Sequence, residues 1–141
     1  GSLFYVEHPV IPLNKTYCTI NIDMLGRVDS FYSGRKPDSN YVYLLLSDTS
    51  KNVINKQLLT KLNTNYAQLI LDTLYENNPD NLINRSDQYS FIKKGIPAIQ
   101  FFSGFHKDYH QPTDTPDKIN YPLFKRRVQL VFATLWTLAN E

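Results

Sequence analysis

The residues best suited to chemistry gather in one polar stretch, residues 106–119, which contains His106 and His110 and three aspartates, Asp108, Asp114 and Asp117. This stretch lies between an apolar run, residues 97–102, and an amphipathic run, residues 123–139. A polar loop of this length is longer than a strand-to-helix connection needs, and long ordered loops often carry function. Since imidazole and carboxylate groups are usual zinc ligands in hydrolytic sites, we interpret the stretch as half of a metal site.

The second candidate ligand is Asp23, at the end of an apolar and β-branched run, residues 16–24, that predicts a strand. Gly26 ends this run, so Asp23 falls at the carboxyl end of the strand, where open α/β sheets bind their ligands. Asp23 and His110 could therefore converge on one rim of the sheet. A plainer interpretation stays open for each of them, because an aspartate at a strand end commonly forms a turn and a loop histidine is commonly just exposed.

Other catalytic patterns fit the sequence less well. His106 and His110 have the spacing of a helical two-histidine zinc motif, but Pro112 argues against a helix there and no glutamate lies between them. Asp114 could instead brace His110 as a carboxylate behind the metal ligand. The sequence has no Gly-x-Ser-x-Gly motif and no glycine-rich phosphate loop, which excludes the usual serine-hydrolase and nucleotide-binding signatures.

The composition indicates one folded domain. The chain has 141 residues, of which 42% are hydrophobic and 20% are charged. A net charge of +2 is too small to indicate a nucleic-acid partner, and we predict that the basic run Lys125-Arg126-Arg127 is the solvent-facing side of a helix. Cys18 is the single cysteine and is expected to be a buried, inert thiol. No apolar run approaches the ~18 residues that a membrane span needs.

Strand-like and helix-like segments alternate along the chain, which predicts an α/β fold with a mostly parallel sheet flanked by helices. We expect strands at 16–24, 41–46 and 97–102, helices at 53–65, 87–94 and 122–139, and loops at 28–40 and 76–84. Residues 67–75 are ambiguous, and we favour extended structure there. Ser86 and Gly95 are expected to cap the middle helix at its two ends. The last helix is predicted to bury one apolar stripe, formed by Phe124, Val128, Val131, Phe132, Leu135 and Leu138.

Three segments, in order, resemble motifs of the co-catalytic zinc aminopeptidase family, which also contains glutamate carboxypeptidase and glutaminyl cyclase. They are Asn-x-Asp-Met-x-Gly-Arg at 21–27, Arg-Ser-Asp-Gln-Tyr-Ser-Phe with Lys-Gly-Ile-Pro at 85–97, and Asp-Tyr-His-Gln-Pro-Thr-Asp-Thr-Pro-Asp-Lys-Ile at 108–119. The order and spacing of the three make the resemblance specific, and it covers nearly the whole chain. It implies that residues 1–141 form a single partial domain, the C-terminal half of a three-layer αβα zinc peptidase.

The resemblance also implies a role for particular residues. In that family, two zinc ions share five protein ligands, and the matching positions here are Asp23 for one zinc and His110 for the other. Tyr109 matches a tyrosine that steadies the tetrahedral intermediate of peptide hydrolysis, where its phenol can donate to the developing oxyanion. The metal-bound water loses its proton to a glutamate and attacks the peptide carbonyl.

The departures from the family pattern matter as much as the matches. The family's first histidine ligand, its bridging aspartate and its Glu-Glu pair all lie upstream of the segment that holds Asp23, and this sequence contains none of them. Gln88 stands where relatives commonly have a histidine. We therefore expect the isolated chain to bind zinc weakly or not at all and to have negligible peptidase activity. Half a sheet would expose an edge, so we also expect self-association or pairing with the missing N-terminal half.

The expected function is that of the C-terminal part of a zinc aminopeptidase, which removes N-terminal residues from peptide substrates. Two alternatives stay open, namely a non-catalytic binding module of the same fold that uses an aromatic rim, and a glutaminyl-cyclase-like acyltransferase with one zinc. Relatives are commonly exported, so the resemblance implies a periplasmic or secreted location.

Overall fold

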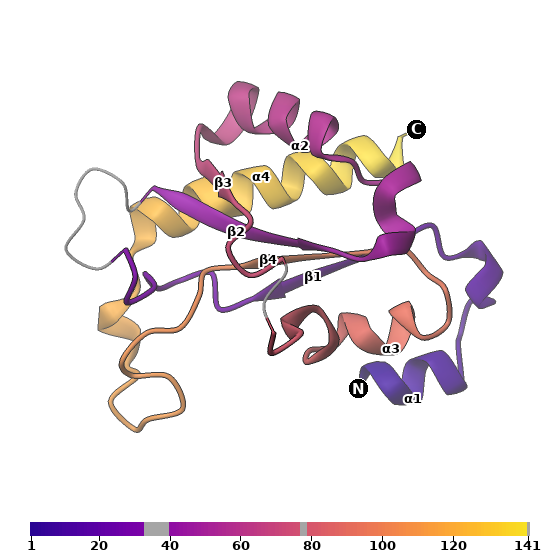
Figure 1. Ribbon diagram of the computed structural model, residues 1–141, viewed down its shortest axis with the longest axis horizontal. Helices are drawn as coiled ribbons and strands as arrows, with labels where there is room; N and C mark the ends of the chain where they lie inside the picture. Colours follow the sequence, from indigo (N-terminus) through magenta and orange to yellow (C-terminus); the bar gives the residue numbers. More distant parts are fainter. Residues whose placement is uncertain (33–39, 77–78, 141) are drawn as a thin grey trace.

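The computed structural model describes residues 1–32, 40–76 and 79–140 (Figure 1). In this part of the chain, four strands form one sheet in the order β1-β4-β2-β3. Helices α2 and α4 cover one face of the sheet, and α1 and α3 lie on the other face (Figure 1). The chain therefore has the predicted three-layer α/β architecture. None of the helices in the described ranges is both long enough and apolar enough to cross a membrane.

The elements alternate along the chain much as the apolar patterns predict. The strands are β1 (Thr19–Asp23), β2 (Tyr41–Leu46), β3 (Ile70–Asp72) and β4 (Ala98–Phe102). The α-helices are α1 (Ser2–Glu7), α2 (Lys56–Leu62), α3 (Gln88–Ile92) and α4 (Tyr121–Ala139). Short helical turns are η1 (Leu13–Lys15), η2 (Asp48–Asn52), the π-helical η3 (Asn63–Ala67), η4 (Leu82–Asn84) and η5 (Pro116–Lys118). In the ambiguous segment 67–75, extended structure is confirmed only at β3, while Ala67 ends η3 and the segment closes in a turn. Residues 33–39 and 77–78 of the predicted loops lie outside the described residues.

The strand directions bring Asp23 and the loop that contains His110 to the same end of the sheet. β1 pairs in parallel with β4, and Asp23 at the end of β1 lies opposite Phe102 at the end of β4. The carboxyl ends of β1 and β4 therefore lie side by side. Asp23, at the end of β1, and the loop that contains His110, which follows β4, are at the same end of the sheet. β2 is parallel to β3 but antiparallel to β4. The expectation of a mostly parallel sheet is thus correct for two of these three pairings.

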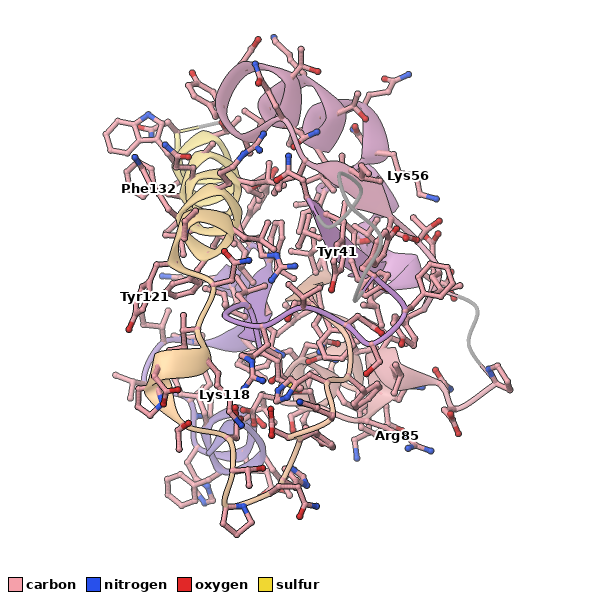
Figure 2. The ribbon with its side chains drawn as sticks, turned by 90° about the vertical axis from the view of Figure 1, so that its left-hand side faces the viewer. Tyr41, Lys56, Arg85, Lys118, Tyr121 and Phe132 are labelled. Carbon is pink, nitrogen blue, oxygen red and sulfur yellow. The ribbon has the colours of Figure 1, made fainter. Side chains whose placement is uncertain are left out.

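The final helix buries a different stripe from the predicted one. Val131 and Leu138 are buried as expected, but Val128, Phe132 and Leu135 are 42%, 60% and 52% exposed. The buried face of α4 is instead formed by Leu123, Arg127, Leu130, Val131, Ala133, Thr134 and Leu138. This set includes two polar residues, which is why a search for apolar spacing alone selects the neighbouring face. Phe132 points away from the sheet (Figure 2).

The prediction of a solvent-facing basic run is wrong for two of its three members. Lys125 is exposed, but Arg126 is half-buried and donates to the backbone carbonyls of Ala67 and Gln68 at 2.7 and 2.6 Å. Arg127 is completely buried. The reason is that both guanidinium groups find carbonyl acceptors, which compensate for the loss of water around a buried charge.

The middle helix and the cysteine can be compared with their predictions directly. Gly95 has φ of 75°, a left-handed conformation that favours glycine, and it follows α3 as expected. Ser86 does not cap this helix, because its hydroxyl donates to Asp23 instead. Cys18 is half-buried and not fully buried as expected, and burial raises the pKa of its thiol; its inertness stays a prediction.

Candidate active site

Asp23 is the last residue of β1, and its carboxylate is oriented by a neighbouring hydroxyl. Ser86 Oγ donates to Asp23 Oδ2 at 3.0 Å, and Asn21 Nδ2 donates in turn to Ser86 Oγ at 3.1 Å. Among the described residues, no side chain donates a hydrogen bond to Asp23 Oδ1. The second oxygen is thus the one left for a ligand from outside the chain.

A buried amide network lies behind Asp23. Gln88 is fully buried, and its Oε1 accepts from Asn21 Nδ2 at 2.7 Å. Its Nε2 donates to Gln100 Oε1 at 2.8 Å and to the carbonyl of Ile83 at 2.7 Å. Gln88 therefore links α3, β1 and β4 through its two amide ends. The amino-acid sequence carries one signal of this network, because Gln100 is the single polar residue in the otherwise apolar strand β4. The pairing of Gln100 with Gln88 does not follow from that signal.

His110 lies in the loop after β4 and takes a left-handed backbone conformation, with φ of 55°. Its ring is exposed and stacks on the ring of Tyr109, with 3.8 Å between the centroids and 22° between the planes. Hydrogen bonds from the Tyr109 amide to the carbonyl of His106 and from the Gln111 amide to that of Asp108, both 2.9 Å, form the turns around it. The backbone of the loop thus presents the imidazole to solvent.

Asp23 and His110 line the same cavity, which has a volume of about 530 Å³ and whose other walls include Met24, Gly26 and Tyr109. Tyr109 also lines an adjoining cavity of about 200 Å³ together with Asp23, Leu82, Phe102 and Phe105. The edge-to-face contact between Tyr109 and Phe105, with centroids 5.1 Å apart, fixes the tyrosine between the two cavities. A group bound between Asp23 and His110 would therefore lie beside the Tyr109 ring.

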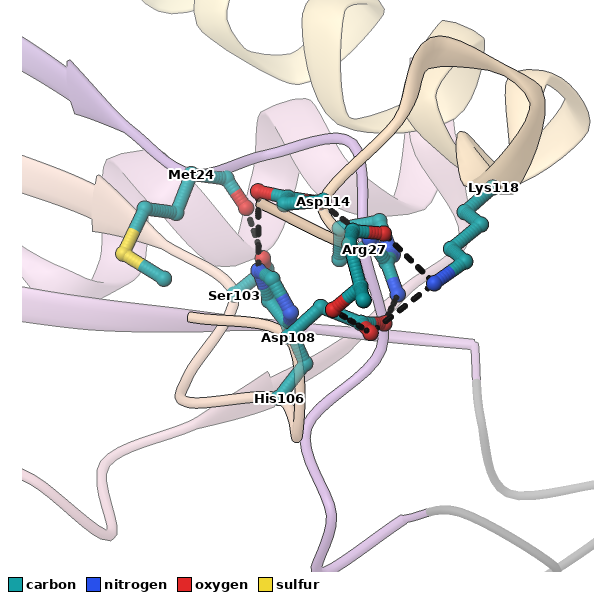
Figure 3. Close-up of polar contacts among 8 residues, drawn as sticks. Met24, Arg27, Ser103, His106, Asp108, Asp114 and Lys118 are labelled. Carbon is teal, nitrogen blue, oxygen red and sulfur yellow. Dashed lines mark hydrogen bonds and ion pairs between the residues drawn. The ribbon is translucent and has the colours of Figure 1, made fainter. Parts of the chain in front are cut away.

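A cluster of charged residues joins the turn after β1 to the loop that carries His110. Arg27 donates to Asp108 Oδ2 at 2.6 Å through Nη2 and to Asp114 Oδ1 through Nη1 (Figure 3). Lys118 Nζ and Thr113 Oγ1 each donate to the other oxygen of Asp108 at 2.8 Å. Lys118, then Arg27 and Thr113, hold the pKa of the Asp108 carboxyl well below its usual range. Asp108 is therefore an acceptor that stays ionised at neutral pH.

The sequence profile of Peptidase family M28 matches residues 1–135. The chain belongs to Peptidase family M28. Among the curated proteins and the solved structures, no significant match to the chain was found. The family assignment confirms the resemblance to the family of zinc aminopeptidases and assigns the chain to a family of peptidases, which are hydrolases, that is zinc-dependent in general.

The two loop histidines of this M28 chain have different environments. His106 is buried, and desolvation, followed by the nearby positive charge of Arg27, lowers the pKa of its imidazole. His110 is exposed, and the segment between the two is a series of turns. The expectation that the segment from His106 to His110 is not a helix is confirmed.

Asp114 lies at the edge of the charged cluster in this M28 chain. Its carboxylate pairs with Arg27, and its second oxygen lies 3.8 Å from His106 Nε2. These contacts position it beside the cavity that it shares with His110. Its role in bracing His110 stays a prediction.

The donor set of the M28 site fits zinc in kind but not in number. Asp23 offers a carboxylate oxygen and His110 an imidazole, and both line one cavity. A catalytic zinc normally has about three protein ligands. In the described ranges, no group of three or more histidine, cysteine, aspartate and glutamate side chains could hold a metal ion. Asp23 and His110 could therefore supply two ligands of a zinc site, but not a complete set.

Proposed function

We propose that this chain is the C-terminal part of a zinc aminopeptidase in which Asp23 binds one zinc ion and His110 binds a second. The observation that supports this proposal is the cavity that the two side chains share at the carboxyl end of β1. The family resemblance supplies the rest, since the other ligands and the glutamate base lie upstream of the Asp23 motif in relatives. The chain by itself is accordingly inactive and binds zinc weakly.

The side chains of this chain would contribute orientation and charge stabilisation. Ser86 donates to Asp23 Oδ2, which would leave Oδ1 as the oxygen that binds the metal. The zinc supplies an activated water when it is bound. Tyr109, packed between Phe105 and His110, would donate its phenolic hydrogen to the oxyanion that forms when the peptide carbonyl is attacked.

The test uses a longer form of the protein that includes the upstream ligands, assayed with amino-acid anilides. We expect hydrolysis by the wild type and a loss of about 10²–10³ in kcat for Tyr109→Phe, the effect of removing one oxyanion donor. Tyr66→Phe, on an exposed tyrosine of η3, is the matched control and should retain full activity. Equal rates for Tyr109→Phe and the wild type would refute the role of Tyr109.

The same assay separates the acyltransferase alternative. A glutaminyl-cyclase-like enzyme would release ammonia from peptides with N-terminal glutamine and leave the anilides intact. An aminopeptidase would cleave the anilides and release free N-terminal residues. C-terminal release from acidic dipeptides would instead assign the chain to the carboxypeptidase branch of the family.

A non-catalytic binding module is the second candidate function. The observation that favours it is the absence of a three-ligand metal group from the described residues. Such a module would bind a peptide through the aromatic wall formed by Phe102, Phe105 and Tyr109. Peptide binding that persists in the presence of a chelator, with no hydrolysis in the longer form, would establish it.

We also propose a periplasmic or secreted location, which fractionation of cells would test.

A further inference from the structure

The turn after β1 is joined to the loop between β4 and α4 at both ends of that loop. At the start of the loop, the hydroxyl of Ser103 donates to the carbonyl of Met24. At its end, the amide of Asn120 donates to the carbonyl of Gly26 at 2.9 Å. The histidine that we propose as a ligand lies between these two anchors, seven residues beyond the first and ten before the second. Contacts at the two ends alone would leave the middle of such a loop free to move.

Arg27 supplies the connection in the middle. Its guanidinium reaches from the turn into the loop and binds Asp108 on one side and Asp114 on the other (Figure 3). These two aspartates flank His110 in the sequence. The Arg27 side chain is only 14% exposed and that of Asp108 only 6%, so this ion pair is weakly screened by solvent.

The loop is also closed on itself around Asp108. Lys118 Nζ donates to Asp108 Oδ1 at 2.8 Å and to the carbonyl of Thr113 at 2.5 Å. These bonds connect Asp108, Thr113 and Lys118, so a contact that holds Asp108 also restrains the segment that contains His110. Arg27 lies four residues beyond Asp23, so the same arginine is tied through its backbone to the other proposed ligand.

We infer that Arg27 is a positioning residue that fixes His110 relative to Asp23, and thereby sets the distance between the two metal ligands. It acts through Asp108 and Asp114: the side-chain hydrogen bonds of Arg27 go to these two aspartates and not to Asp23 or His110. This inference rests on the proposed function, since it requires that Asp23 and His110 bind metal.

The test compares four forms of the chain: wild type, Arg27→Gln, Arg27→Lys and the control Lys56→Gln. Lys56 is an exposed cation on α2 that pairs with Glu76 at 2.9 Å, away from Lys118 and the loop (Figure 2). Backbone hydrogen exchange is measured at Tyr109, Gln111 and Asp114, whose amides form the turns of the loop. Zinc binding is measured by titrating zinc chloride and following the imidazole nitrogen resonances of His110.

We expect the three loop amides to exchange about tenfold faster in Arg27→Gln, because charge-assisted hydrogen bonds to both aspartates are lost. Zinc affinity should fall by about 10–100-fold, as for other residues that orient a metal ligand. Arg27→Lys should lie between wild type and Arg27→Gln, since one ammonium cannot hold two carboxylates in a fork. Lys56→Gln should match the wild type in both measurements.

Unchanged exchange in Arg27→Gln would overturn the inference, and so would faster exchange with unchanged zinc affinity. In both cases the proposed function survives if the wild type binds zinc at His110. A wild-type chain whose His110 resonances do not respond to zinc at all would contradict the proposal that this chain binds zinc weakly by itself, and the inference would fall with it. If Arg27→Gln fails to fold, Arg27→Lys alone decides between these outcomes.

Discussion

At the scale of single residues, the two proposed ligands are held in different ways. Asp23 ends a paired strand and accepts a hydrogen bond from Ser86, which in turn accepts one from Asn21. His110 projects from a loop and stacks on Tyr109. The carboxylate is therefore oriented before any metal arrives, whereas the imidazole depends on how well its loop is held.

The orientation of Asp23 can be tested through its hydroxyl partner. We predict that Ser86→Ala lowers zinc affinity about tenfold, because the carboxylate loses the bond that fixes its rotation. Ser90→Ala is the matched control, since Ser90 lies on α3 and its hydroxyl contacts that of Ser2 at 3.1 Å. Zinc titration of the two variants provides the measurement. Equal affinity in Ser86→Ala and the wild type would show that the hydroxyl does not orient the ligand.

The buried imidazole of His106 makes stability depend on pH. Burial lowers its pKa in the folded chain, so the unfolded chain takes up a proton more readily once the pH falls below about 6.5. The contribution of this neutral imidazole is complete above that pH and is lost as the pH falls toward the folded pKa. We predict that urea unfolding shows a smaller drop in stability between pH 7 and pH 5.5 for His106→Gln than for the wild type. An equal drop in both proteins would contradict the role of the neutral His106 imidazole in this pH dependence.

At the scale of elements, one buried arginine joins the last helix to the site. Arg127 on α4 donates to the carbonyls of Leu25 and Arg27 at 2.7 and 2.6 Å, and to that of Tyr41 at 2.9 Å. Its guanidinium also lies 4.8 Å from the centre of the Tyr41 ring. The helix thus also holds the turn after β1 in place.

Removal of this arginine should be costly. We predict that Arg127→Met destabilises the chain by about 2–4 kcal/mol, because the buried carbonyl groups lose their donors. The control Lys125→Met, on an exposed neighbour in the same helix, should change stability by less than ~0.5 kcal/mol. Urea unfolding of both variants measures the difference. A small effect of Arg127→Met would mean that water replaces the guanidinium without loss.

At the scale of the whole molecule, an apolar surface extends over the edge strand and the last helix. Ile22 on β1 and Leu135 on α4 are 54% and 52% exposed, and both line one apolar groove with Tyr17, Cys18, Ile20 and Val131. β1 lies at the edge of the described sheet. An uncovered apolar face beside a free strand edge favours association with another chain.

We predict that the chain self-associates, or pairs with the remainder of a longer peptidase when that is present. Size-exclusion chromatography with light scattering measures the mass in solution. The double variant Ile22→Lys, Leu135→Lys should shift the chain toward the monomer while circular dichroism stays unchanged. A wild-type chain that is monomeric at high concentration without any partner would contradict this prediction.

The sequence predicts the parts of this fold that follow from local pattern. Apolar runs locate β1, β2 and β4, and the motif residues Asp23 and His110 are found together on one cavity. Strand direction does not follow from such runs, because a buried strand has the same composition whether its neighbour is parallel or antiparallel. β2 therefore differs from the expectation at its pairing with β4.

Contacts between distant segments account for the remaining differences. Arg27 and Asp108 are 81 positions apart, and Arg127 is 102 positions from Leu25. Nothing in the local sequence around either arginine distinguishes a buried cation from an exposed one. The rotation of α4 has the same origin, since Arg127 and Thr134 belong to the buried face only because the turn and the sheet provide acceptors and space for them.

The measurement that tests the account most directly is zinc bound per chain, by equilibrium dialysis and elemental analysis over a range of zinc concentrations. It compares the wild type with the double variant Asp23→Ala, His110→Ala and with a control, His8→Ala, Asp80→Ala, which removes the same two residue types from elsewhere. We predict weak zinc binding by the wild type and the control, and its loss in the double variant. Equal binding in all three proteins would contradict the ligand assignment, and no binding by the wild type would contradict the prediction that this chain holds zinc weakly by itself. Two tightly bound zinc ions in the wild type would contradict the claim that this chain carries only a share of the site.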